Sequence, residues 1–304
     1  MKRKKVLVTG SNGMLGKDLV KTLKKNSNYE IFGINRTFDF DLTDLSSFKI
    51  DITNLIELQD TLNLIDPDII VHCAAMIDVD ACEKHREYAK AINIKSTEIL
   101  ASFKPNNTKF VFISTDSVFD GQEGFYGEND KKTPLNYYAE TKSNAEEVIK
   151  KKDKSNSIII RTNIYGFHKS KGKSLVEWAL KELLNNNKIL GFNDVYFNPL
   201  YTKQLARVII DLIENNYSGT IHLCSENSVS KYDFLKKIAL KFNINTDLIE
   251  SVSVDDKNFR AIRPKNTTLS NKIFKNLFRY SLTIDDGIEL LYVDYQRKGI
   301  DYNE

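Results

Sequence analysis

Cysteine is scarce in this chain, with only Cys73, Cys82 and Cys224 among 304 residues. An odd number of widely spaced cysteines, without a Cys-x-x-Cys pair, excludes a disulfide framework and argues against zinc. We therefore expect no bound metal, and reduced thiols in the cytoplasm. Long apolar runs are also missing, since none approaches the ~20 residues of a membrane helix. Only three apolar residues follow the basic run 2–5, so we expect neither a membrane anchor nor a signal peptide.

An excess of charge of one sign is absent too. The 44 Lys and Arg residues nearly balance 41 Asp and Glu residues, which leaves a net charge of +3. That is too little to indicate a nucleic-acid partner. A hydrophobic content of 41% and a charged content of 28% are ordinary for a globular enzyme. The length allows one large domain or two unequal ones.

Segments with strand and helix patterns alternate through the first half of the chain. This order predicts an α/β fold with a doubly wound parallel sheet. The β-rich runs are 5–9, 29–34, 69–71, 110–114 and 158–160. Apolar residues recur at helical spacing over 15–23, 54–65, 88–103 and 136–152.

Three glycines stand at the junction of the first predicted strand and helix, in the pattern GxxGxxG. The first glycine permits a tight turn, the second lets backbone approach a pyrophosphate, and the third lets helix and strand pack closely. Phosphates bind well at such a helix N-terminus. We therefore expect dinucleotide binding by Gly10, Asn12, Gly13, Met14, Leu15 and Gly16.

The pattern loosens after about residue 163. Helices are predicted at 174–184, 202–214 and 230–242, with a late strand at 220–223. We predict an NAD(P)-binding Rossmann domain over 1–162, with a returning segment near 192–228. Residues 163–304 would mainly form a smaller, mostly helical substrate-binding domain.

The end of the second strand bears on the choice of cofactor. An acidic residue there accepts the ribose 2′-OH of NAD, but this strand ends Gly33-Ile34-Asn35-Arg36. Arg36 is suited to pairing with a 2′-phosphate. We therefore predict NADP(H) in preference to NAD(H), with contacts from Asn35 and Arg36. The alternative is that Arg36 is an ordinary exposed side chain and that Asp39 or Asp41 serves NAD.

Tyr138 and Lys142 carry the most informative chemistry, because four residues of helix place them on one face. A phenol beside an ammonium group is a proton donor with a lowered pKa. Thr115 follows a predicted parallel strand, at the end where ligands bind, and its hydroxyl suits the same carbonyl oxygen. We expect these three residues to catalyse carbonyl reduction. Two other pairs share the spacing but lack such a strand: Tyr165/Lys169 and Tyr232/Lys236.

Taken in order, the motifs resemble those of the dTDP-4-dehydrorhamnose reductase family, within the extended short-chain dehydrogenases/reductases. The resemblance spans nearly the whole chain. The segments that carry it are 8–16, 51–53, 72–75, 79–83, 91–93, 114–121, 134–142, 161–166 and 263–266.

The resemblance implies a role for each predicted site residue. Tyr138 would donate the proton, Lys142 would hold the nicotinamide ribose, and Thr115 would bind the reacting carbonyl. Further cofactor contacts or supports would be Asp51, Ile52, Cys73, Ala74, Ala75 and Asn93. Substrate contacts would be Thr115, Asp116, Ser117, Tyr138 and Arg263.

The implied reaction reduces the C4 keto group of a nucleotide-linked 4-keto-6-deoxy sugar. The foremost expectation is dTDP-4-dehydrorhamnose converted to dTDP-rhamnose for cell-surface polysaccharide. Relatives often pair, so a homodimer is an expectation, although no heptad or apolar stripe marks an interface. Ser117 stands where the family usually has Tyr, and Asn163-Ile164 replaces a Trp-like contact.

Other functions on the same fold stay open. A nucleotide-sugar dehydratase would have Asp-Glu directly after the Thr, whereas here Asp116 is followed by Ser117. An epimerase would retain tightly bound NAD. A non-catalytic alternative is an NADP-binding regulatory subunit resembling the β subunit of methionine adenosyltransferase.

Overall fold

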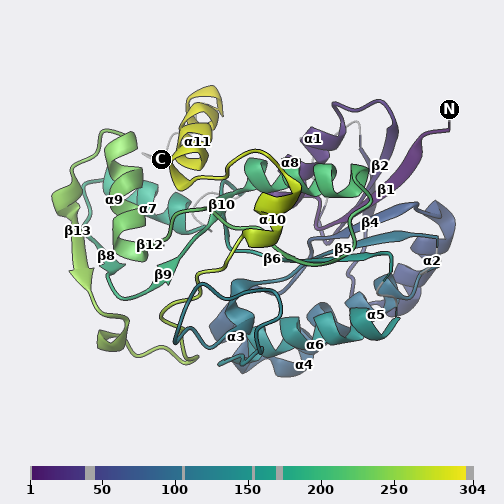
Figure 1. The fold of residues 1–304 in the computed structure, drawn as a ribbon, viewed down its shortest axis with the longest axis horizontal. Coiled ribbons are helices and arrows are strands. Elements are labelled where there is room, and N and C mark those ends of the chain that lie inside the picture. The colour runs from purple at the N-terminus through teal and green to yellow at the C-terminus, as the bar shows by residue number, and fades with distance from the viewer. Residues whose placement is uncertain (1, 38–44, 105–106, 153–154, 169–173, 299–304) are drawn as a thin grey trace.

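The protein is described from a computed structural model, which covers residues 2–37, 45–104, 107–152, 155–168 and 174–298 (Figure 1). Its centre is a parallel sheet with the strand order β3-β2-β1-β4-β5-β6-β11. This arrangement confirms the predicted doubly wound α/β fold. The strands are β1 (Lys4–Thr9), β2 (Tyr29–Asn35), β3 (Ser46–Lys49), β4 (Ile69–His72), β5 (Lys109–Ile113), β6 (Ser157–Arg161) and β11 (Gly219–His222).

Helices cover both faces of this sheet. Side chains alternate along β1, so Val6 and Val8 pack on one face and Leu7 on the other. The first face is covered by α1 (Met14–Leu23), α8 (Thr202–Glu214) and α10 (Lys272–Leu277). The opposite face is covered by α2 (Leu55–Ile65), α5 (Ser96–Ala101) and α6 (Tyr137–Lys152).

The parallel register brings the carboxyl ends of the strands to one edge of the sheet. Thr9 in β1 pairs with His72 in β4, and His72 pairs with Phe112 in β5. Ile113 pairs in turn with Ile160 in β6. The loops after these strands therefore meet at this edge, where α/β sheets bind their ligands.

The helix predicted over 88–103 is divided into three parts. An α-helix α4 (Arg86–Lys90) runs into a π-helix η2 (Ala91–Lys95) and then into α5. In the wider turn the Asn93 amide donates to the Met76 carbonyl at 3.0 Å and accepts from the Met76 N–H at 2.8 Å. It also donates to Thr141 in α6 at 2.9 Å. A further helix, α3 (Val79–Lys84), had no predicted counterpart.

The rest of the chain combines helices with short strand pairs. Helices α7 (Leu175–Leu184), α9 (Lys231–Lys241) and α11 (Ile284–Lys298) share a core around Phe234. Ser174 and Ser230 are the N-caps of α7 and α9. Both stand at the start of a helix that the sequence predicted. The strand pairs are β7 (Ile164–Tyr165) with β10 (Leu200–Tyr201), β9 (Tyr196–Phe197) with β12 (Val229–Ser230), and β8 (Ile189–Phe192) with β13 (Ile249–Val252). Single-turn helices are η3 (Asp116–Val118), η4 (Thr246–Leu248) and η5 (Val254–Asp256).

Besides α10, two elements from the second half of the chain pair with the large sheet or cover it. Strand β11 pairs with β6, and α8 packs on α1. Both lie within the segment 192–228 that was expected to return. The domain boundary at residue 162 stays a prediction.

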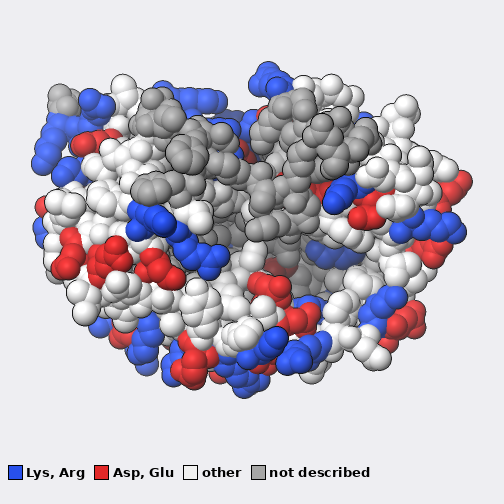
Figure 2. All heavy atoms as spheres, turned by 180° about the vertical axis from the view of Figure 1, so that it is seen from behind, with Lys and Arg blue, Asp and Glu red and all other residues white. Residues whose placement is uncertain are grey.

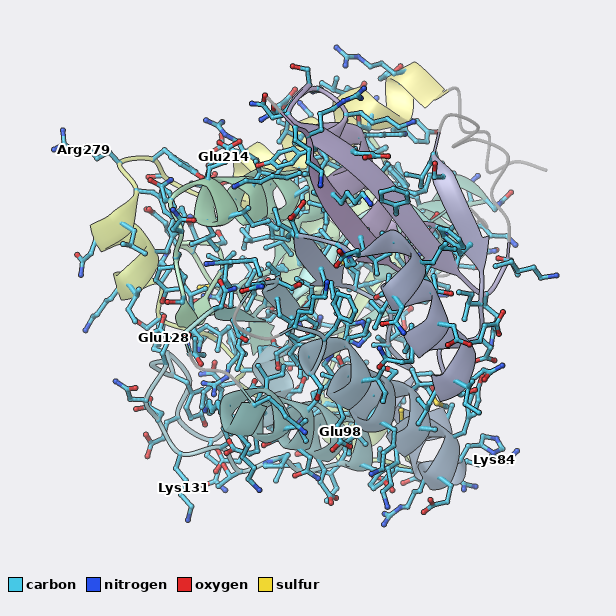
Figure 3. All side chains as sticks on the ribbon, turned by 90° about the vertical axis from the view of Figure 1, so that its right-hand side faces the viewer. Lys84, Glu98, Glu128, Lys131, Glu214 and Arg279 are labelled. Carbon is cyan, nitrogen blue, oxygen red and sulfur yellow. The ribbon has the colours of Figure 1, made fainter. Side chains whose placement is uncertain are left out.

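The surface carries charges of both signs. Lys and Arg side chains are interspersed with Asp and Glu over the face shown in Figure 2. Lys131 and Arg279 point outward at the edge of the molecule (Figure 3). Among the helices that the structure describes, none has the length and apolar character needed to cross a membrane.

Candidate active site

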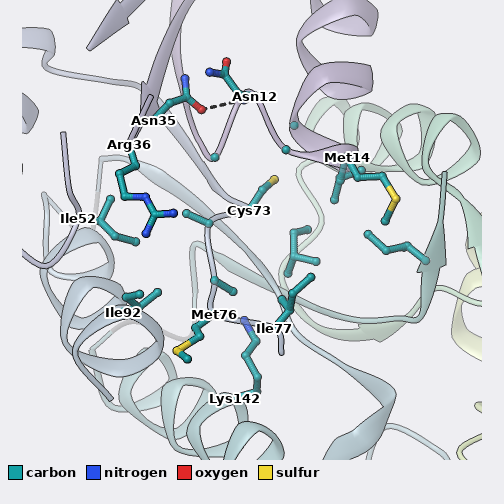
Figure 4. A pocket seen from close by; sticks show the side chains of 18 of the residues that line it. Asn12, Met14, Asn35, Arg36, Ile52, Cys73, Met76, Ile77, Ile92 and Lys142 are labelled. Atoms are coloured by element: carbon teal, nitrogen blue, oxygen red, sulfur yellow. Dashed lines mark hydrogen bonds between the residues drawn. The ribbon is translucent and has the colours of Figure 1, made fainter. Parts of the chain in front are cut away.

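A cavity of about 750 Å³ lies along the carboxyl edge of the sheet, between the glycine turn and α6. It is lined by residues that follow β1, β2, β4, β5 and β6, and by side chains of α6 (Figure 4). The structure brings most of the predicted site residues to this cavity: Gly10, Asn12, Gly13, Met14, Leu15, Gly16, Asn35, Arg36, Asp51, Ile52, Cys73, Ala74, Ala75, Thr115, Ser117, Tyr138 and Lys142.

The glycine turn fits a phosphate group. Gly10 has a φ of +66°, which favours glycine. A Cβ added to Gly16 would lie 2.1 Å from the Gly10 carbonyl oxygen, so α1 packs against the turn only without a side chain there. Gly13 is the N-cap of α1 and supplies no capping side chain. The N–H groups of the first turn are therefore available to an anion such as a pyrophosphate.

The end of β2 supports the turn and places a cation at the cavity. The Asn35 side chain accepts from the Asn12 N–H at 2.7 Å and donates to the Ser11 hydroxyl at 2.6 Å. Arg36 points into the cavity, and its Nη1 lies 3.5 Å from the hydroxyl of Tyr88 (Figure 4). Asp39 and Asp41, the alternative partners for NAD, lie outside the described residues.

Thr115, which follows β5, forms a hydrogen bond with Tyr138 of α6, and Lys142 lines the same cavity one helical turn after Tyr138. Thr115 is the N-cap of η3 and accepts from the Ser117 N–H at 3.2 Å. Burial raises the pKa of Tyr138, and this effect outweighs the lowering by a hydrogen bond with Thr115; the charge of Asp116 raises the pKa further. The lowering of the Tyr138 pKa that was expected from a neighbouring ammonium group is therefore not found. The ammonium of Lys142 lies 3.9 Å from the centre of the Phe112 ring, and burial lowers the pKa of Lys142 to about 7.

Asp116 is buried behind Thr115 rather than among the cavity-lining residues. One carboxylate oxygen accepts from the Thr115 and Ser117 hydroxyls, at 3.1 and 3.2 Å. The other accepts from Asn163 at 2.9 Å and from Thr267 at 2.7 Å. This carboxylate therefore links the end of β5 to the segments that carry Asn163 and Thr267. Its expected contact with substrate stays a prediction.

Arg263 is held by an ion pair and is not among the cavity-lining residues. Its Nη2 donates to Asp80 at 2.6 Å, and the same carboxylate accepts from the Ala261 N–H at 2.9 Å. Its Nη1 is buried and has no hydrogen-bond partner among the described residues. The role of Arg263 toward substrate stays a prediction. Within the described part of the chain, no group of three His, Cys, Asp or Glu side chains is suited to a metal.

Comparison with known proteins gives the family. The family described as RmlD substrate binding domain matches residues 4–289. The chain belongs to the dTDP-4-dehydrorhamnose reductase family, and it is an oxidoreductase. It is 30% identical to a probable low-salt glycan biosynthesis reductase of Haloferax volcanii, over 95% of this chain and 98% of the relative.

Two further relatives of this family member bear on function. A crystal structure of dTDP-4-dehydrorhamnose reductase from Bacillus anthracis, in complex with NADP, is 30% identical, with a TM-score of 0.85. The match covers 96% of this chain and 99% of that one. The methionine adenosyltransferase 2 subunit beta of Danio rerio is 27% identical, over 88% of this chain and 82% of the relative.

Several cavity residues of this family member escaped prediction from the sequence. Tyr88 and Ile92 line the cavity from α4 and η2. Their four-residue spacing puts them on one face of a helix, and this spacing is the feature of the sequence that could have indicated a shared position. Met76 and Ile77 follow β4, where only the preceding small residues were expected to line the site. His168 also lines the cavity, and no motif marked it.

We expect stability to fall with acid because two histidines, His72 and His222, are buried. His72 lies between the hydroxyls of Thr9, at 2.7 Å, and Thr97, at 3.0 Å, and burial lowers its pKa to about 3. Burial also lowers the pKa of His222 to about 4. The unfolded chain binds these protons first, so stability is full above pH 6.5 and falls below it.

Each unit of pH below 6.5 then costs about 1.4 kcal/mol per histidine. Urea unfolding between pH 7 and pH 5 measures this slope. His72→Gln should reduce the slope by about half, whereas the exposed His85→Gln serves as the control and should leave it unchanged. A stability that is constant from pH 7 to pH 5 would contradict a buried neutral His72.

Proposed function

We propose that this protein reduces the C4 keto group of a nucleotide-linked 4-keto-6-deoxy sugar with NADPH. The foremost substrate is dTDP-4-dehydrorhamnose, with dTDP-rhamnose as the product for polysaccharide biosynthesis. The observation that carries the proposal is that Thr115, Tyr138 and Lys142 line the same cavity as the glycine turn. The glycine turn, where the cofactor would be held, and the proton donor therefore share one continuous space.

The residues supply the proton and the geometry. When bound, the nicotinamide cofactor supplies the hydride to C4 of the sugar. Tyr138 donates its hydroxyl proton to the carbonyl oxygen as negative charge develops there. Its raised pKa keeps the phenol protonated at neutral pH. The Thr115 hydroxyl holds the same oxygen. Lys142, one helical turn after Tyr138 in the same cavity, would hold the nicotinamide ribose.

Arg36 supports the preference for NADP(H). It is an exposed cation that points into the cavity from the end of β2 (Figure 4). A charge-assisted hydrogen bond to a 2′-phosphate contributes about 1.5–3 kcal/mol, which corresponds to roughly 10–100-fold in affinity. Arg36→Ala should therefore raise the KM for NADPH by about that factor and change the KM for NADH little. Equal increases in the KM values for NADPH and NADH would contradict the preference for NADP(H).

A turnover screen tests the function as a whole. The purified protein is offered dTDP-, UDP- and GDP-linked 4-keto-6-deoxy sugars with NADPH or NADH, and cofactor oxidation is followed at 340 nm. We expect turnover that is fastest with a dTDP sugar and NADPH. Inactivity across the panel, together with tight NADPH binding, would instead favour a binding role like that of a regulatory subunit. Bound NAD that survives purification would favour an epimerase.

A further inference from the structure

A buried carboxylate lies directly behind the proposed catalytic groups. Glu146 is on α6, has no exposed surface, and binds groups from three other segments. It accepts from the Ser114 hydroxyl at 2.6 Å and from the Arg161 guanidinium at 2.9 and 3.0 Å. The Lys132 ammonium also donates to it, at 3.1 Å. The positive charges of Arg161 and Lys132 compensate the negative charge of the buried Glu146 carboxylate.

The positions of these partners in the chain are informative. Ser114 comes immediately before Thr115 at the end of β5, and Glu146 comes four residues after Lys142 on α6. Four residues of helix place Glu146 on the same face as Lys142 and, one turn earlier, Tyr138. The hydrogen bond between Ser114 and Glu146 therefore joins the strand end that carries Thr115 to the helix face that carries the other two groups.

Arg161 anchors the same carboxylate to the neighbouring strand. It lies at the end of β6, is buried, and binds both oxygens of Glu146 through its fork. Its Nη1 donates to the Glu128 carbonyl at 3.2 Å and lies 3.2 Å from His222 Nε2 at the end of β11. The carboxylate thus fixes α6 against the ends of two strands that line the cavity.

We propose that Glu146 is a positioning residue, which through Ser114 and Arg161 sets the distance between Thr115 and the Tyr138–Lys142 face of α6. The proposal rests on the proposed function, because these three groups matter together only if they act on one carbonyl. An error of about 1 Å in such an arrangement costs on the order of 100-fold in rate.

The charge of Glu146 has a second effect, on Lys142. Glu146 raises the pKa of Lys142, opposing the lowering by burial. The other groups that face Lys142 are Cys73 and His72 from the β4 side and the Phe112 ring from β5. His72 is neutral at the pH values of the test, because burial lowers its pKa to about 3, so Glu146 is the anion that helps Lys142 to stay protonated.

Two variants separate position from charge. Ser114→Ala removes one hydrogen bond and leaves the ion pair with Arg161 intact. Glu146→Gln removes the charge, and its single amide oxygen cannot accept from all the donors that the carboxylate binds. The matched control is Glu147→Gln, because Glu147 is the next residue, is half exposed and binds the same Lys132 at 2.8 Å.

Steady-state kinetics, thermal unfolding and NADPH fluorescence titrations from pH 6 to pH 9 form the test. We expect Ser114→Ala to lower kcat by about tenfold or more while the KM for NADPH and the melting temperature change little. NADPH affinity should fall as the pH rises, because Lys142 loses the proton with which it would hold the nicotinamide ribose. Glu146→Gln should move this fall to lower pH by about one unit. Glu147→Gln should behave as wild type in all three measurements.

The outcomes distinguish this proposal from the proposed function. If no keto sugar is turned over but Glu146→Gln still shifts the pH dependence of NADPH binding, the function fails and the link from Glu146 to Lys142 holds. If the wild type is active and both Ser114→Ala and Glu146→Gln match Glu147→Gln, the positioning role is overturned. If Glu146→Gln does not fold, the kcat of Ser114→Ala alone decides whether the positioning role holds.

Discussion

Tyr138→Phe is expected to lower kcat for keto-sugar reduction by about 10²–10⁴-fold, the usual contribution of a general acid. The substitution removes the hydroxyl proton and keeps the ring that lines the cavity. NADPH affinity should therefore stay within about twofold of wild type, because cofactor recognition depends mainly on the glycine turn and the strand ends. The measurement is kcat with the best substrate of the turnover screen, with NADPH binding by fluorescence alongside.

The adjacent tyrosine offers a matched control for this variant. The ring of Tyr137 lies 4.7 Å from the Arg86 guanidinium and is not among the cavity-lining residues. Tyr137→Phe keeps that contact and should keep full activity. If Tyr138→Phe retained more than a tenth of the wild-type rate, another group would have to supply the proton, and the assignment of Tyr138 would be wrong.

The second large effect is expected from Gly16→Ala. The added Cβ would lie 2.1 Å from the Gly10 carbonyl oxygen and 2.8 Å from the Ser11 Cα, so either α1 or the turn must move. Such overpacking costs about 1–3 kcal/mol. It also displaces the N–H groups expected to hold the pyrophosphate. We therefore expect a lower melting temperature together with at least tenfold weaker NADPH binding, measured by thermal unfolding and fluorescence titration.

Gly127→Ala is the control for the glycine substitution. A Cβ there meets its nearest neighbour, the Asp130 carboxylate, at 3.7 Å, which is ordinary van der Waals contact. The expected change is within about 0.5 kcal/mol, with NADPH affinity unchanged. A Gly16→Ala protein that bound NADPH as tightly as the Gly127→Ala protein would show that close packing of α1 on the turn is dispensable for cofactor binding.

The sequence predicted the parts of the fold that repeat a simple pattern. The patterns of apolar residues predicted six of the seven strands in the large sheet and, apart from α10, the helices that cover it. Strand β3 escaped because its four residues, Ser46–Lys49, are half exposed and polar at both ends. The two-residue strands such as β7 and β9 are too short for any alternation to be seen.

The candidate site was predictable to a similar extent, and for similar reasons. The glycine spacing and the Tyr138–Lys142 spacing are local, so a linear pattern reveals them. The partners of Asp116 come from residues 163 and 267, and Arg36 meets Tyr88, which only the folded chain brings together. The pKa shifts of Tyr138 and Lys142 depend on how deeply each is buried, and residue spacing contains no measure of that.

The late return of β11 has a consequence for synthesis of the chain. A ribosome completes β6, with its three consecutive isoleucines, before it makes residues 162–218. Until β11 emerges, β6 is the open edge of the growing sheet, and an apolar edge strand invites pairing with other chains. The apolar face of α1 also stays uncovered until α8 has been made. The nascent protein therefore passes through a stage in which the glycine turn and the Tyr138–Lys142 pair are already made while the sheet edge is still prone to aggregation. The synthesis of residues 219–222 ends that stage.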